Sequence, residues 1–305
     1  MNNHEIRHQL FQYLNANADT YGRAVMSDSI VLSKGSVVTK IPRRKCKEEI
    51  YVFERMKAAG INMPKILKKE ILSCPLGDFE TYCMEKISEP VDVIESESEL
   101  LTPDYYSFLR GTLESLGNVL ISGFGSITMS DGESSVISSE YTSKKEFLHS
   151  RLNSALSRSA SNSINITHNQ VEDNVQEDVM GHLAHSDILK NIVFSKSDKK
   201  YYLLDPQINT SSANKDWDLS LYLIYANAFH LTSGLMQFLE TIQIEGWEEF
   251  VVTAGINSLE RINYYSRHDG SKVEEISDFA KKTQDGYLLV GQESIRGDKL
   301  CQKKK

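Results

Sequence analysis

Polar residues between positions 185 and 205 have the types and the order that phosphoryl transfer requires. The triplet from His185 to Asp187 is followed by Asn191, and an apolar run from position 202 ends at Asp205. A carboxylate in a loop can accept the proton of an attacking hydroxyl. An amide oxygen and a second carboxylate can hold Mg²⁺, which requires hard oxygen ligands. We therefore predict Asp187 as the base and Asn191 and Asp205 as metal ligands.

Predicted strands surround these residues, at about 179–184, 191–194 and 201–204. A separate unit of helices and strands precedes these strands in the chain. The first 20 or so residues have helical spacing, and two β-rich runs at 29–32 and 37–41 flank Gly35 and predict a hairpin. A helix at about 47–59 and a strand at 81–84 follow, so Lys40 ends a hairpin strand and Glu49 lies in the next helix.

The remainder of the chain is predicted to be mainly helical. Apolar residues recur with a helical period at 105–121 and 147–156, and three or four helices are expected between Trp217 and about position 282. Polar tracts lie at 126–143 and 157–169. We expect a mobile insertion at about 157–178 and a frayed C-terminal end.

Composition excludes several classes of protein. The 305 residues are 40% hydrophobic and 25% charged, which is typical of a globular chain, and the net charge of -8 argues against a nucleic-acid binder. No apolar run approaches the ~20 residues of a membrane span, and the N-terminus has no signal-peptide core, so we expect a cytoplasmic protein without a membrane partner. The four cysteines lack metal-ligand spacing. The sequence does not indicate an oligomeric state.

These motifs together resemble the aminoglycoside phosphotransferase and choline kinase-like family. The family's His-Gly-Asp loop with a following Asn is similar to His185 to Asn191, and its apolar-Asp-Pro metal motif is similar to Leu204-Asp205-Pro206. Asp218-Leu219-Ser220 resembles the downstream Asp-Leu-Ala motif, and Met84-Glu85-Lys86 resembles the hinge that meets adenine. The resemblance covers about residues 25–235.

The resemblance implies an α+β, two-lobed protein-kinase-like fold, with a small β-rich nucleotide-binding lobe over 1–87 and a larger, mostly helical lobe over 88–305. It implies an enzyme that moves the γ-phosphate of ATP, with Mg²⁺, to a hydroxyl of a small molecule. Further roles also follow from the resemblance. Lys40, positioned by Glu49, would bind the phosphates, Met84, Glu85 and Ile87 would form the hinge, and His185 and Asp218 would support the catalytic loop.

Two features depart from the kinase pattern. Three residues separate Asp187 from Asn191, one fewer than in protein kinases, and there is no Gly-rich phosphate loop. Asn191 is then either still on the metal in a tightened loop or displaced from it. Each site residue also has a structural alternative: Asp187 as a loop cap, Lys40 as a solvated strand end, and Glu48 in place of Glu49.

Two other functions stay open at this point. The short loop favours a catalytically weak or inactive nucleotide-binding or regulatory module. A protein kinase is the second alternative, but Asp-Phe-Gly, Ala-Pro-Glu and Gly-rich motifs are all missing from the sequence.

Overall fold

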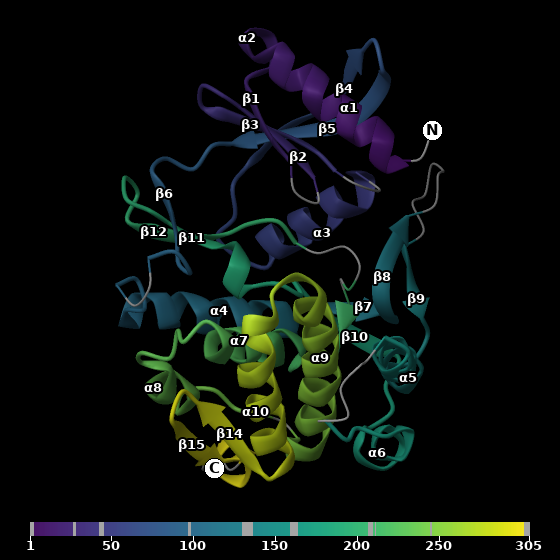
Figure 1. The fold of residues 1–305 in the computed structure, drawn as a ribbon, viewed down its shortest axis with the longest axis vertical. Coiled ribbons are helices and arrows are strands. Elements are labelled where there is room, and N and C mark those ends of the chain that lie inside the picture. Colours follow the sequence, from purple (N-terminus) through teal and green to yellow (C-terminus); the bar gives the residue numbers. More distant parts are fainter. Residues whose placement is uncertain are drawn as a thin grey trace.

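The computed structural model describes residues 3–26, 29–42, 46–96, 99–129, 137–158, 164–206, 210, 212–244 and 246–301. The chain forms two lobes (Figure 1). The upper lobe in this view contains an antiparallel sheet with the strand order β1-β2-β3-β5-β4. Its elements are α1 (Asn3–Ala16), α2 (Ala18–Tyr21), β1 (Arg23–Met26), β2 (Ile30–Lys34), β3 (Val37–Ile41), α3 (Cys46–Ala58), β4 (Ile66–Cys74) and β5 (Gly77–Glu85).

Side-chain alternation along β2 and β3 separates the two faces of this sheet. Leu32 packs with Leu10 and Leu14 of α1 in one apolar cluster. Val31 and its register partner Lys40 line a cavity instead. Because side chains alternate with period two, a register shift of one residue would turn Lys40 toward α1. The hairpin and the two helices that the sequence predicts here are confirmed.

The larger lobe is mainly helical, with β6, β11 and β12 near its junction with the upper lobe and the hairpin of β14 and β15 at its far end (Figure 1). Its helices are α4 (Pro103–Asn118), α5 (Lys144–Leu156), α6 (His168–Asn174), α7 (Trp217–Ala228), α8 (Leu235–Leu239), α9 (Trp247–His268), α10 (Val273–Gln284) and α11 (Gly297–Cys301), with the 3-10 turns η1 (Leu189–Asn191) and η3 (Gly270–Lys272). Every residue of α7 is buried, so this helix is the centre of the lobe.

The strands of this lobe belong to three sheets. The first has the order β7-β10-β13-β8-β9, the second β12-β11-β6, and the third is the hairpin β14-β15. The strands are β6 (Pro90–Asp92), β7 (Leu120–Ser122), β8 (Phe124–Met129), β9 (Ile137–Tyr141), β10 (Met180–Leu183), β11 (Ile192–Ser195), β12 (Lys200–Leu203), β13 (Ser212–Ala213), β14 (Tyr287–Val290) and β15 (Glu293–Arg296). Since β6 pairs with β11, the chain enters the second lobe within a few residues of the end of β5.

Three segments differ from the expectations. The polar tract at 126–143 contains most of β8 and all of β9, which pair as a hairpin. The hairpin β14-β15 and α11 follow α10, where only a frayed end was expected; residues 302–305 lie outside the described residues.

The expected mobile insertion at 157–178 is packed where the structure describes it. Ile164, Ile166, Val171 and Val175 are buried in the main core, and α6 begins with a capping box at Thr167. Residues 159–163 lie outside the described residues. Ser and Asn dominate the composition of the tract, but four spaced apolar side chains are enough to attach it to the lobe.

Within the described residues, none of the helices combines the length and the apolar character needed to cross a bilayer.

Gly255, in the middle of α9, allows a test of how the segment that contains Ile166 packs against this helix. A methyl group at Gly255 would overlap the Ile166 side chain. Gly255→Ala should therefore destabilise the protein by about 1–3 kcal/mol through overpacking. In an Ile166→Ala background the overlap is gone, and the same substitution should stabilise the protein by about 0.5–1 kcal/mol through helix propensity. Urea unfolding of the four proteins measures both values. If Gly255→Ala changed the free energy of unfolding equally in both backgrounds, the segment that contains Ile166 would not pack on α9.

Candidate functional site

Lys40 on β3 contacts residues of both lobes. Its ammonium contacts the carboxylates of Glu49 on α3 and of Asp205, which follows β12. Lys40 and Glu49 are only 3% and 4% exposed. Burial lowers the pKa of Lys40, but the neighbouring carboxylates of Asp205 and Glu49 raise it more, so the pKa lies above its ordinary value and the residue is charged.

The structure distinguishes the two adjacent glutamates of α3. Glu49 contacts Lys40, whereas Glu48 accepts a hydrogen bond from the Met129 N–H of β8 at 3.2 Å. Tyr82 on β5 donates its hydroxyl to Glu49 Oε1 at 2.5 Å. From the sequence, Tyr82 is predicted only as part of a strand at 81–84. Tyr82 lies directly across from Lys40 in the β3-β5 register. Pairing the two predicted strands in this register could therefore have identified Tyr82 as a site residue.

Asp218, near the start of α7, holds the backbone of the predicted catalytic loop. Its two carboxylate oxygens accept the N–H groups of His185 at 2.8 Å and of Ser186 at 2.6 Å. Burial raises the pKa of Asp218 to about 6, and the two backbone donors act in the opposite direction by stabilising the carboxylate. Asp218 therefore contacts the backbone of the loop that it was predicted to support.

Ser186 is the middle residue of the triplet that resembles a His-Gly-Asp motif, so it stands where that motif has glycine. Its φ of 64° lies in the left-handed region, which glycine adopts without strain. The hydroxyl of Ser186 donates to the Thr210 carbonyl at 2.7 Å and accepts from Trp217 Nε1 at 3.1 Å. These two bonds, together with Asp218, hold a conformation that serine would otherwise rarely adopt.

The imidazole of His185 is a structural part of the same loop. Nε2 lies 2.5 Å from the Leu204 carbonyl, and Nδ1 lies 3.3 Å from the Asp187 N–H. Since Nδ1 must accept, Nε2 carries the proton and the ring is neutral. Burial lowers the pKa of His185 to about 4, which agrees with this tautomer. His185 thereby connects the loop of Asp187 to the strand end that carries Asp205.

The short spacing between Asp187 and Asn191 is accommodated by the 3-10 turn η1. The N–H of Asn191 donates to the Ile188 carbonyl at 3.0 Å, and its side-chain Nδ2 donates to the Asp187 carbonyl at 2.9 Å. The Leu204 N–H donates to the Asn191 carbonyl at 2.8 Å. A tighter turn thus replaces the missing residue, and Asn191 stays beside both Asp187 and the Asp205 segment.

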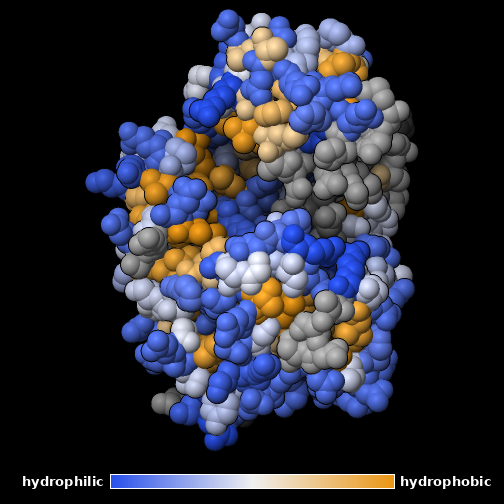
Figure 2. Space-filling model, in the orientation of Figure 1, coloured by the Kyte–Doolittle hydropathy of each residue, from blue (hydrophilic) through white to orange (hydrophobic). Residues whose placement is uncertain are grey.

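One cavity of about 340 Å³ joins the predicted hinge to the predicted metal ligands. Met84, Glu85 and Ile87 line it at one side, and Asn191 and Asp205 line it at another. Its remaining walls are largely apolar and come from both lobes: Val31, Val38, Phe53, Pro64, Val193 and Leu204. Figure 2 shows that the surface is hollowed between the two lobes.

The donor set of this cavity fits a hard divalent cation that is shared with a phosphate ligand. Asp205 supplies a carboxylate, and Asn191 has its amide nitrogen committed to Asp187, so its oxygen is the remaining ligand atom. Mg²⁺ usually takes one or two protein carboxylates and completes its shell with waters and phosphates. Within the described parts of the chain, no group of three or more His, Cys, Asp or Glu side chains forms a self-contained metal cage.

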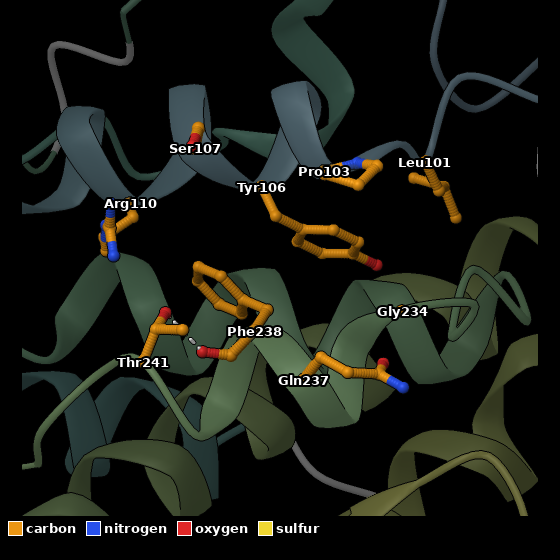
Figure 3. Close-up of a pocket in the computed structure, with 9 residues that line it drawn as sticks. All are labelled: Leu101, Pro103, Tyr106, Ser107, Arg110, Gly234, Gln237, Phe238 and Thr241. Carbon is orange, nitrogen blue, oxygen red and sulfur yellow. Dashed lines mark hydrogen bonds between the residues drawn. The ribbon is translucent and has the colours of Figure 1, made fainter.

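A larger cavity, of about 420 Å³, lies between α4 and α8 (Figure 3). Figure 3 shows the rings of Tyr106 and Phe238 side by side in it, and these rings are stacked 5.2 Å apart. Of the described residues that line it, Arg110 alone is charged. Because it contains none of the predicted site residues, this cavity is not the candidate catalytic site.

The neutral state of His185 predicts a pH dependence of stability. In the unfolded chain histidine protonates near pH 6.5, whereas the folded protein keeps His185 neutral down to about pH 4. The unfolded state then binds more protons in this window, so stability falls as the pH is lowered. Because His185→Gln removes this titration, the free-energy difference between wild type and His185→Gln should fall by about 3 kcal/mol from pH 7 to pH 4. Urea unfolding at a series of pH values measures the difference, in which contributions such as that of Asp218 cancel. Parallel stability curves would contradict the assigned tautomer.

Comparisons with known proteins identify the fold. No protein-family model matches the chain, and no curated protein matches it by sequence. Among solved structures, a thermostable mutant of aminoglycoside phosphotransferase APH(4)-Ia in its apo form is similar, with a TM-score of 0.55 and 10% identity over 90% of this chain and 99% of that chain. Ternary complexes of that enzyme with hygromycin B and either ADP or AMP-PNP give TM-scores of 0.54 and 0.52 at 11% and 12% identity, and both cover 91% of this chain and 99% of that chain. The chain therefore has the two-lobed, protein-kinase-like fold of the aminoglycoside phosphotransferases.

Proposed function

We propose that this protein is an ATP-dependent phosphotransferase that moves the γ-phosphate to a hydroxyl group of a small molecule. One observation carries the proposal. The buried ammonium of Lys40 contacts Glu49 and Asp205, and Asp205 shares a cavity with Asn191 and with the hinge residue Ile87. A charged lysine, two oxygen ligands and an apolar slot are the parts that bind a nucleotide and its metal.

The apolar walls of the cavity suit a purine ring, and the hinge offers backbone groups to its edge. The N–H groups of Glu85 and Lys86 already donate to the carbonyls of Lys65 and Ser36 at 2.9 Å each. The N–H of Ile87 donates to none of the described residues. It is therefore the donor in this segment that is available to a ring nitrogen of the base.

The phosphates would lie toward Lys40, with Asp205 and Asn191 as the ligands of Mg²⁺. When bound, the metal neutralises charge on the phosphate oxygens. Lys40 contributes a fixed positive charge at the same place, and Glu49 with Tyr82 restricts its position. Preorganised charge of this kind costs no reorganisation during the reaction.

Asp187 would act on the acceptor. Its carboxylate accepts the proton of the acceptor hydroxyl, the hydroxyl oxygen forms the new bond to the γ-phosphorus, and the bond to the bridging oxygen breaks to release ADP. What supports this role is the position of Asp187, one hydrogen bond from Asn191 in a loop that Asp218 and His185 immobilise.

Substitution of Asp187 tests the enzymatic part of the proposal. ADP release is first measured with a panel of sugars, amino alcohols and aminoglycosides. With the best acceptor, Asp187→Asn should lower kcat by about 10²–10⁴-fold, because proton transfer to a positioned base contributes that much. The melting temperature should stay near that of wild type. Asp78→Asn, at the exposed start of β5, is the matched control. Near wild-type turnover in Asp187→Asn would remove this residue from its role.

Nucleotide binding is tested separately by thermal denaturation. A ligand that binds only the folded state stabilises it by about 2.7 kcal/mol at a hundredfold excess over its Kd. ATP with Mg²⁺ should therefore raise the melting temperature by a few degrees, and ATP with EDTA should raise it less. In Asp205→Ala the Mg²⁺-dependent part should disappear.

Two results of this experiment would reject the enzyme. If ATP stabilises the protein equally with and without Mg²⁺ and no acceptor is phosphorylated, the chain is a nucleotide-binding module with a kinase-like fold. If ATP has no effect at all, both functions are wrong and only the fold remains.

A further inference from the structure

A cluster of cations and tyrosines lies beside Asp187, and the proposed mechanism does not use it. The ammonium of Lys190, in the loop between Asp187 and Asn191, lies 4.4 Å from the ring centroid of Tyr225, 5.4 Å from that of Tyr265 and 5.7 Å from that of Tyr264. The guanidinium of Arg261 lies 5.5 Å from the Tyr225 centroid. We call these five residues the Lys190-Arg261 cluster.

The cluster belongs to the acceptor side of the site. Lys190 comes from η1 and Arg261 from the second half of α9, and Figure 1 shows that the turn from α9 into α10 lies toward the upper lobe. Burial lowers the pKa of Arg261, but Tyr225, Glu260 and Asp187 together raise it more. Burial likewise lowers the pKa of Lys190, and the carboxylate of Asp187 opposes this. The hinge and Lys40 instead line the nucleotide cavity, in which neither cluster cation takes part.

Positive charge exceeds negative charge in this place. Among the described residues, neither Lys190 nor Arg261 is within ion-pair distance of a carboxylate. Glu260, the neighbour of Arg261 in the sequence, is occupied by Arg151, whose Nη2 lies 2.5 Å away. With the Glu260 carboxylate paired to Arg151, the two cations lie near the carboxylate of Asp187 in the part of the chain that the structure describes.

The cluster also contains buried donors that lack acceptors. Arg261 Nε and the Tyr225 hydroxyl are buried and have no hydrogen-bond partner among the residues that the structure describes, and Tyr225 as a whole is fully buried. Such groups are nearly always satisfied in folded proteins. Carboxylate and phosphate oxygens accept several hydrogen bonds at once and pair with guanidinium in a fixed geometry. Tyr264 is 45% exposed, so the cluster has a side that is open to solvent.

We propose that the acceptor carries a carboxylate or phosphate group in addition to its hydroxyl, and that Lys190 and Arg261 bind this anionic group. The inference rests on the proposed phosphotransfer function, since it concerns the acceptor of that reaction. A cationic acceptor is disfavoured by the same two charges. The site would therefore differ in substrate class from the solved enzyme of similar fold that binds hygromycin B.

Calorimetric titration with three matched probes tests the proposal without requiring turnover. The probes are glycerol 3-phosphate, glycerol and 2-amino-1,3-propanediol, which are anionic, neutral and cationic. Glycerol 3-phosphate should bind roughly 10-fold to 100-fold more tightly than glycerol, as expected for charge-assisted hydrogen bonds. The amine should bind no better than glycerol. The titrations are repeated with Mg²⁺ and AMP-PNP present, which should leave the binding of glycerol 3-phosphate in place.

Variants locate the binding. Lys190→Gln and Arg261→Gln should each remove most of the preference for the anion, and Arg261→Lys should retain part of it. Arg267→Gln, on the exposed face of α9, and Lys272→Gln, whose ammonium lies over Phe229, are the matched controls and should bind like wild type. Melting curves of all variants show that they are folded.

Three results would overturn the proposal: equal or preferential binding of glycerol or the amine, absence of binding by all three probes, and an anion preference that survives in Lys190→Gln and Arg261→Gln. Displacement of glycerol 3-phosphate by AMP-PNP would place the anion in the nucleotide cavity and would also overturn it. Because the anion preference is measured without nucleotide as well, it can hold when ATP fails to bind, and ATP can bind when the anion preference fails. The two proposals therefore fail separately.

Discussion

The burial of a charged lysine is the constraint on which the rest of this structure depends. An ammonium that is 3% exposed is tolerated only if its charge is paired, and Lys40 needs carboxylates from two different places in the chain. Removing one partner of such a pair typically costs about 3–5 kcal/mol, so α3 and the segment after β12 are fixed relative to β3. The cavity that we propose to bind the nucleotide lies between these elements, and its shape follows from their attachment to one side chain.

In the larger lobe, buried backbone groups are likewise paired with side chains. Asp218 accepts two N–H groups of the predicted catalytic loop, while the His185 ring contacts the Leu204 carbonyl next to Asp205. Loops with left-handed serine and aspartate residues are strained unless their surroundings hold them. The buried helix α7 supplies that support, since it carries both Asp218 and Trp217. Asp218, His185 and Trp217 thereby support the loop and the strand end that carry Asp187, Asn191 and Asp205.

The sites that we propose for the nucleotide and for the acceptor differ in their balance of charge. The cavity that includes the hinge has one buried lysine that is balanced by two carboxylates, whereas the Lys190-Arg261 cluster has two cations beside Asp187. A shared fold with aminoglycoside phosphotransferases fixes the placement of the loops, but it leaves the residues of α7 and α9 free to vary. The charge of the acceptor is therefore a property of this chain and not of its fold.

The sequence alone determined the β2-β3 hairpin, the helices on either side of it and the order of Asp187, Asn191 and Asp205, because strand and helix periods and loop motifs are local signals. The remaining features come from the tertiary structure. It selected Glu49 over Glu48 as the partner of Lys40, added Tyr82, and converted the short loop into a 3-10 turn that keeps Asn191 in the cavity. It also packed Ile166 onto α9 in a tract whose composition suggested mobility. Each of these depends on contacts between residues far apart in the chain, and neither local spacing nor composition encodes such contacts.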